Sequence, residues 1–113
     1  MICRIELQAL PNQYCSTLLN DQECDIQVRQ LGSHLYLTLW VEDALIYQNA
    51  LCSIGSVING SEVLGFSGAL YFVDNKGKDS PQWEELGDRW QLYYVSPDET
   101  LYDELTNARA VHN

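Results

Sequence analysis

Apolar and polar residues alternate along several short stretches of this chain, which is the pattern of β-strands with one face in a core. The clearest stretch is 35–41, where every odd position is leucine or valine and the even positions carry Tyr36, Thr38 and Trp40. Both sets of side chains are bulky. We therefore expect a strand that is covered on both faces or that lines an interface.

Other stretches show the same alternation or a short apolar run, and turn-forming residues separate them. They predict strands at 2–7, 14–19, 24–28, 44–47, 67–73 and 90–95. The segment 49–65 contains Gly55, Gly60 and Gly65 and predicts a loop with one helical turn. A polar loop at 74–81 and a short helical turn at 83–87 complete the expected elements.

This series of short strands favours a small barrel or sandwich, and the first expectation is an all-β fold with a small OB-like antiparallel barrel of about six strands. The chain has 113 residues, which suits one domain. We assign the barrel to 1–96 and a helical or partner-ordered tail to 97–113. Residues expected mainly in the core are Leu35, Leu37, Leu39, Leu70, Phe72, Trp90 and Leu92.

The tail shows a helical rather than a strand-like pattern. Leu101, Leu105 and Ala108 recur at the spacing of one helix face, and Asp98 is suited to cap the helix. We expect a short amphipathic C-terminal helix, or a segment that becomes ordered only against a partner.

Charge narrows the possible partners. The chain has 16 Asp+Glu against 6 Lys+Arg, a formal net charge of -10. Such a surface repels phosphate, so we expect no stable nucleic-acid binding. We also expect no membrane insertion, because no apolar run approaches the roughly 18 residues of a membrane helix. The first residues show no signal peptide, so we expect the protein to be made in a reducing cytoplasm.

Candidate chemistry is sparse. The four cysteines form no Cys-x-x-Cys pair, which argues against a zinc site and favours free thiols that are mostly buried. A catalytic cysteine would need a positioned base such as His34, and nothing in the sequence places one there. The Asp74–Asp79 loop and the adjacent Glu84 and Glu85 are interpreted as solvated surface. The sequence thus predicts no catalytic residues, no cofactor and no metal.

Aromatic residues are the enriched class that suggests a function. The adjacent Tyr93 and Tyr94 must point to opposite faces of their strand, so one of them faces outward or toward a partner. Aromatic anchors in a protein–protein interface suit this charge balance better than stacking on nucleobases. The candidate interface residues are Trp40, Tyr94, Leu101, Tyr102 and Leu105.

Between residues 6 and 99 the chain resembles small baseplate plug-type proteins with an OB-like domain from contractile-tailed, myovirus-type phages. The matching segments, in order, are LPNQ at 10–13, IQVR at 26–29, LYLTL at 35–39, LGFSGAL at 64–70 and LGDRWQLYYV at 86–95. The expected hairpin glycine is missing from 42–49, and the tail beyond residue 99 has no counterpart.

The resemblance implies a structural, non-enzymatic part of a virion tail baseplate, made in the host bacterial cytoplasm. It implies several copies around the tail axis, packed against the tail tube, the hub or the spike. The matching residues are interpreted as fold residues, with Arg89 beside Asp88 expected in a structural salt bridge. We also expect carboxylates to gather on a face toward the DNA channel, apart from an aromatic docking face.

Other functions are left open by the residues alone. An OB-fold module that binds nucleic acid is one alternative, although the net charge opposes it. A small ligand-binding barrel or a hydrolase that uses Cys or His is another. A third is an acidic inhibitor that masks a basic host surface.

Overall fold

The computed structural model describes residues 1–54, 57–59 and 65–110, and it is mostly β with one helix at the C-terminal end. The strands are β1 (Ile2–Ile5), β2 (Asn12–Leu19), β3 (Gln22–Leu31), β4 (His34–Val41), β5 (Ala44–Cys52), β6 (Val57–Asn59), β7 (Ala69–Asp74) and β8 (Trp90–Val95). A short 3-10 helix, η1 (Trp83–Glu85), precedes β8, and the α-helix α1 (Thr100–Ala110) follows it.

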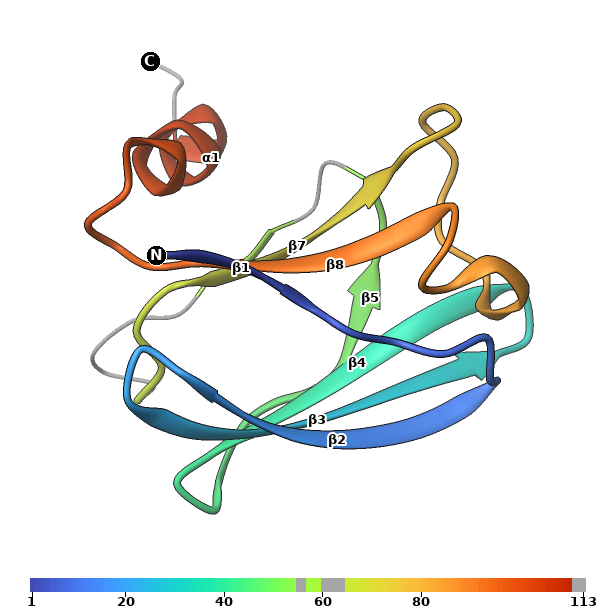
Figure 1. The fold of residues 1–113 in the computed structure, drawn as a ribbon, viewed down its shortest axis with the longest axis horizontal. Helices are drawn as coiled ribbons and strands as arrows, with labels where there is room; N and C mark the ends of the chain where they lie inside the picture. The colour runs from blue at the N-terminus through green and yellow to red at the C-terminus, as the bar shows by residue number, and fades with distance from the viewer. Residues whose placement is uncertain (55–56, 60–64, 111–113) are drawn as a thin grey trace.

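The strands form two antiparallel four-stranded sheets, with orders β1-β8-β7-β6 and β2-β3-β4-β5. The sheets lie face to face as two layers (Figure 1). The second sheet is a meander in which each strand pairs with the next one in sequence. The chain crosses between the layers before β2 and again after β5.

The two sheets remain separate, so the closed OB-like barrel of the sequence prediction is not confirmed. Along the described strands no ladder joins one sheet to the other. The edges of β1 and β2 are instead parted by a groove of about 350 Å³, lined by residues that include Ile5 and Cys15. Alternation predicted about six strands where the described part of the chain has eight. Closure depends on pairing between edge strands, which alternation does not encode.

The core lies between the two sheets, and all seven residues expected there are buried. Leu35, Leu37, Leu39, Leu70 and Leu92 have no exposed surface, and Phe72 and Trp90 are 6% and 3% exposed. In the second sheet the inward positions are supplied by the odd residues of β4 and the even residues of β3. This is the alternation expected of strands that bury one face.

Tight turns fix the register of the meander. The β2–β3 turn at Asn20 and Asp21 and the β4–β5 turn at Glu42 and Asp43 each have two residues with φ between 51° and 68°. Two-residue turns with both φ values positive match the twist of a hairpin. The β4–β5 turn therefore forms without the glycine that the family resemblance suggested.

The segment predicted as a loop at 49–65 differs in the structure. β5 continues to Cys52, and the three-residue strand β6 follows at Val57–Asn59. Two of the three glycines in this segment, Gly55 and Gly60, lie outside the described residues. The predicted helical turn at 83–87 is present as η1.

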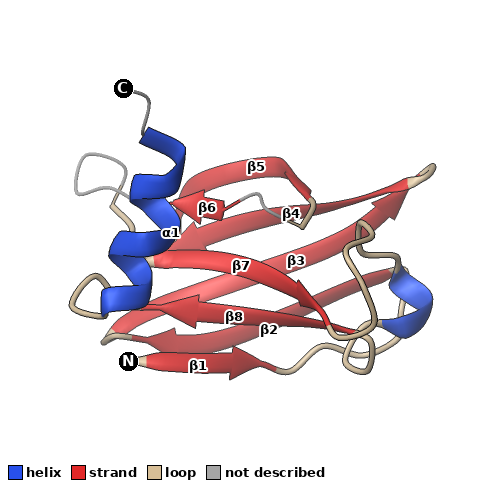
Figure 2. Ribbon diagram, turned by 90° about the horizontal axis from the view of Figure 1, so that it is seen from above, coloured by secondary structure: helices blue, strands red, loops and turns tan. Residues whose placement is uncertain are grey.

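Helix α1 lies on the outer side of the first sheet, beside β6 (Figures 1 and 2). Ala69 and Val95 are opposite each other in that sheet and are fully buried, although they belong to its outward set. The helix accounts for this burial, because it covers the same end of the sheet. Thus the predicted tail helix is confirmed, and it packs on its own domain.

Arg89 holds the 74–81 loop, although not through Asp88 as expected. Its Nε and Nη2 donate to the two carboxylate oxygens of Asp74 at 2.8 and 2.9 Å, and Nη2 also lies 2.8 Å from Asp79. The guanidinium stacks over Trp90 at 4.3 Å from the ring centre. Arg89 is the main cause of a pKa for Asp74 well below the ordinary range of a carboxyl group.

Candidate partner-binding surface

Three of the five candidate interface residues lie on α1. Leu101, Tyr102 and Leu105 are half-buried, whereas Asp103 and Glu104 are exposed. The helix thus has an apolar side and a charged side, as the spacing predicted. Part of the apolar side is already used against the chain's own sheet, and the side chain of Ala108 lies outside the described residues.

Tyr94 was a candidate interface residue, but it is not part of an accessible surface, because its side chain points into the core. Its side chain is fully buried between the sheets, where the hydroxyl donates to the backbone oxygen of Ser67 at 2.6 Å. Burial raises the pKa of Tyr94 to about 12, so the hydroxyl remains a donor. The neighbouring Tyr93 points the other way and stacks on Tyr71 at 5.6 Å.

Trp40 lies on the outward face of the second sheet. Its ring is half-buried and stands 6.2 Å from the ring of Tyr14. Further apolar side chains share this face, because residues directly opposite each other in antiparallel strands point the same way. Together they form what we call the outer sheet face, made of Tyr14, Leu18, Tyr36, Trp40, Leu45 and Leu51.

The pairing register explains how residues distant in sequence meet there. Trp40 is opposite Asp25 on one side and Leu45 on the other, and Tyr36 is opposite Leu51. Of these residues, only Trp40 was a candidate from the sequence. Leu45 and Leu51 were not candidates from the sequence. The β4–β5 pairing has two register shifts, between Leu37 and Leu39 and between Leu39 and Trp40, which no sequence pattern marks.

One end of the outer sheet face is acidic. A groove of about 400 Å³ is lined there by Leu18 and by the carboxylates of Glu23, Asp25 and Asp43, among other residues. Asp25 accepts a hydrogen bond from the Ser16 hydroxyl at 2.6 Å. Aromatic and acidic side chains therefore share this face, and the expected separation between them does not hold here.

The cysteines give no activated nucleophile. All four are free thiols, and burial raises the pKa of Cys24 to about 11 and that of Cys52 to about 12. Burial also raises the pKa values of Cys3 and Cys15. A thiol that stays protonated at neutral pH is a poor nucleophile and a poor metal ligand.

Among residues 1–54, 57–59 and 65–110, no three His, Cys, Asp or Glu side chains are grouped so as to hold a metal ion. No helix in this described part has the length and apolar character to cross a membrane.

Comparison with known proteins identifies the family. No curated protein matches the chain. Residues 2–98 match the family model described as cyanophage baseplate Pam3 plug gp18. This match covers both sheets and ends just before α1, in agreement with the resemblance over 6–99. The chain therefore belongs to this family of phage baseplate plug proteins, which supports a structural role in a baseplate.

Proposed function

We propose that this protein is a structural, non-enzymatic subunit of the baseplate of a contractile phage tail. In this proposal several copies surround the tail axis and bind the tail tube, the hub or the spike. The observation that carries the proposal is the family match over residues 2–98, which spans every strand of the two sheets.

The chemistry of the chain supports a role in assembly. The raised thiol pKa values leave no activated cysteine. The four most exposed of the large apolar side chains in the described residues, Tyr14, Leu18, Leu45 and Leu51, lie on one sheet face. An exposed apolar patch with a polar rim is typical of protein contact surfaces. The net charge of -10 also lets DNA pass nearby without being held.

Helix α1 is a second proposed contact. Leu101, Tyr102 and Leu105 are only half-buried by the chain's own sheet, so part of their surface is left for a partner. The family match ends at residue 98 and the helix begins at Thr100. A contact made by this tail, 97–113, is therefore an addition to the domain that the family shares.

The experiment is complementation of a phage that lacks this gene, followed by mass spectrometry of purified baseplates. We expect the wild-type chain in the baseplate, in more than one copy. The double variant Leu101→Asp/Leu105→Asp should be incorporated less, whereas Asp103→Ala/Glu104→Ala, on the exposed side of the same helix, should be incorporated normally. Wild-type chain that is made but absent from purified tails would refute the proposed function.

A further inference from the structure

The outer sheet face exposes several large apolar side chains in the described part of the chain. Tyr14, Leu18, Leu45 and Leu51 are 61%, 59%, 52% and 48% exposed, the four highest values among the large hydrophobic side chains of the described residues. Among the described elements, α1 and the 74–81 loop lie toward the other sheet (Figures 1 and 2). Exposed apolar side chains gathered on one sheet face, together with the polar outward residues of β3, favour an interaction site.

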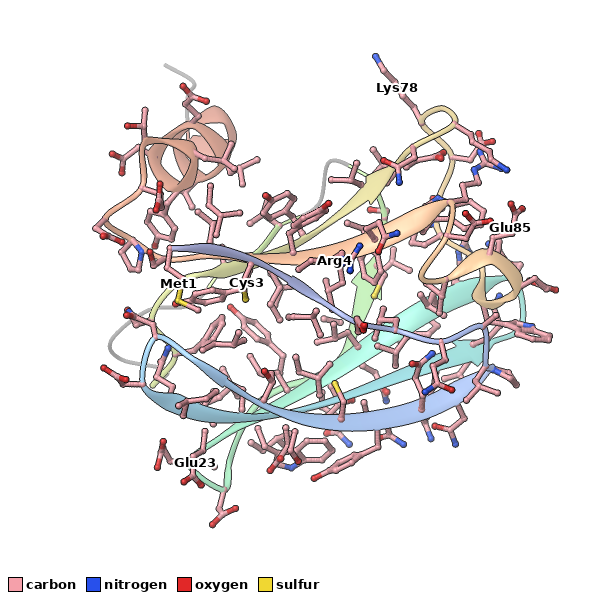
Figure 3. All side chains as sticks on the ribbon, viewed as in Figure 1. Met1, Cys3, Arg4, Glu23, Lys78 and Glu85 are labelled. Atoms are coloured by element: carbon pink, nitrogen blue, oxygen red, sulfur yellow. The ribbon has the colours of Figure 1, made fainter. Side chains whose placement is uncertain are left out.

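The acidic groove at the β2–β3 turn end of this face favours a partner that carries positive charge. Glu23 projects on the outer side of its sheet, away from the other layer (Figure 3). The side chain of Glu42 joins the cluster, since its carboxylate accepts a hydrogen bond from the backbone N–H of Glu23 at 2.7 Å. Within the described residues, none of the salt bridges involves Glu23, Asp25, Glu42 or Asp43.

These two features together favour one type of occupant. Apolar side chains of a partner would cover Tyr14, Trp40 and Leu45. A Lys or Arg of the partner would enter the groove, with its methylene stem on Leu18 and its charge beside the carboxylates of Glu23 and Asp25. Long cationic side chains are suited to such a site, because the methylene stem favours apolar contacts and the charged head group favours carboxylates.

A second copy of this chain does not fit the same requirement. The whole sequence has 6 Lys+Arg against 16 Asp+Glu, and Arg29 is the only Lys or Arg in β2–β5. Two copies meeting through this face would bring their acidic grooves into the same interface with little compensating charge. Like charges placed together at an interface oppose association. Nucleic acid is excluded by the same carboxylates.

We infer that the outer sheet face binds a segment of a neighbouring baseplate protein that presents apolar side chains and at least one Lys or Arg to the groove lined by Leu18, Glu23, Asp25 and Asp43. This inference rests on the proposed baseplate role and specifies the partner class for it. The contact differs from that of α1, which lies on the opposite sheet.

The test removes the charge of the groove with little change in shape. The variant Glu23→Gln/Asp25→Asn is compared with Glu84→Gln/Asp88→Asn, which loses the same charge near η1, at the other end of the molecule (Figure 1). Glu84 and Asp88 are exposed. The reversals Glu23→Lys/Asp25→Lys and Glu84→Lys/Asp88→Lys form a stronger pair. Circular dichroism and thermal unfolding establish that each variant is folded.

Two readouts separate this inference from the proposed function. The first is NMR titration of the isolated protein with a synthetic peptide of alternating valine and lysine, and with a matched valine–glutamate peptide. We expect the lysine peptide to shift resonances of β2–β5, with affinity at least about tenfold lower for the groove variant than for the η1 variant. The second readout is incorporation of the protein into baseplates. We expect the groove variant to be incorporated less than the η1 variant, and the groove reversal Glu23→Lys/Asp25→Lys to show the larger loss.

Several results would overturn the inference. Equal lysine-peptide affinities of the groove and η1 variants would do so, and so would equal incorporation of both while the wild-type chain is present in baseplates. A wild-type dimer in sedimentation that the groove reversal dissociates would show a self-interface instead. If the peptide result holds but the wild-type chain is absent from tails, the proposed function fails and the cationic specificity of the face stands.

Discussion

Leu37→Ala tests the central packing of the sandwich. Leu37 lies in β4, an inner strand of its sheet, and its side chain has no exposed surface. The substitution removes three carbon atoms, and at about 0.8 kcal/mol each their transfer accounts for about 2.4 kcal/mol. A cavity that does not collapse adds to this, so we expect a loss of about 2.5–5 kcal/mol in the free energy of unfolding.

The matched control is Leu45→Ala, which removes the same atoms from the neighbouring strand. Leu45 is 52% exposed, so about half of the transfer term applies and the expected loss is about 1 kcal/mol. Urea titration measures both values, with unchanged m-values showing that the two-state comparison is valid. A loss below about 0.5 kcal/mol for Leu37→Ala, or equal losses for the two variants, would refute the assignment of the core.

Two further predictions concern single positions. Gly68 has φ of 116°, and a Cβ there would lie 2.4 Å from the ring of Tyr94, so Gly68→Ala should cost about 2–5 kcal/mol. The control Gly32→Ala has φ of 63° and no atom within 4 Å of the added Cβ, so it should lower the free energy of unfolding by only about 1–2 kcal/mol in the same titration. Similar losses for the two variants would contradict the close approach of Tyr94 to Gly68. Because the folded-state pKa of Asp74 is depressed, its ionisation stabilises the fold above the unfolded pKa of about 3.9, and this contribution is lost as pH falls toward the folded value. The stability difference between wild type and Asp74→Asn should therefore shrink below about pH 4, and parallel pH curves for the two proteins would contradict the ion pair with Arg89.

Some strands of this fold could be predicted from the sequence and others could not. The strand through Leu35, Leu37 and Leu39 was predicted because an apolar set repeats every second residue. β6 was missed because three residues between glycines leave too short a pattern. Tyr93 and Tyr94 were known to face opposite ways, but which one is buried depends on the pairing of β8 with β1 and β7.

The binding surface was predictable only in part. Trp40 could be identified as a candidate contact residue because a large aromatic side chain is unusual on a strand face that contacts solvent. The acidic groove could not be found, since Asp25 and Asp43 belong to different hairpins and meet only through the β3–β4–β5 register. The helical stripe of Leu101 and Leu105 was predicted, whereas its packing against the first sheet depends on tertiary contacts that periodicity does not specify.

A cryo-EM map of the assembled tail tests the central claim most directly. We predict several copies of this chain in the baseplate, with Trp40 and Leu45 covered by another protein and a Lys or Arg of that protein between Glu23 and Asp25. A baseplate without this chain would contradict the proposed function. Copies whose outer sheet face is turned to solvent would contradict the docking surface.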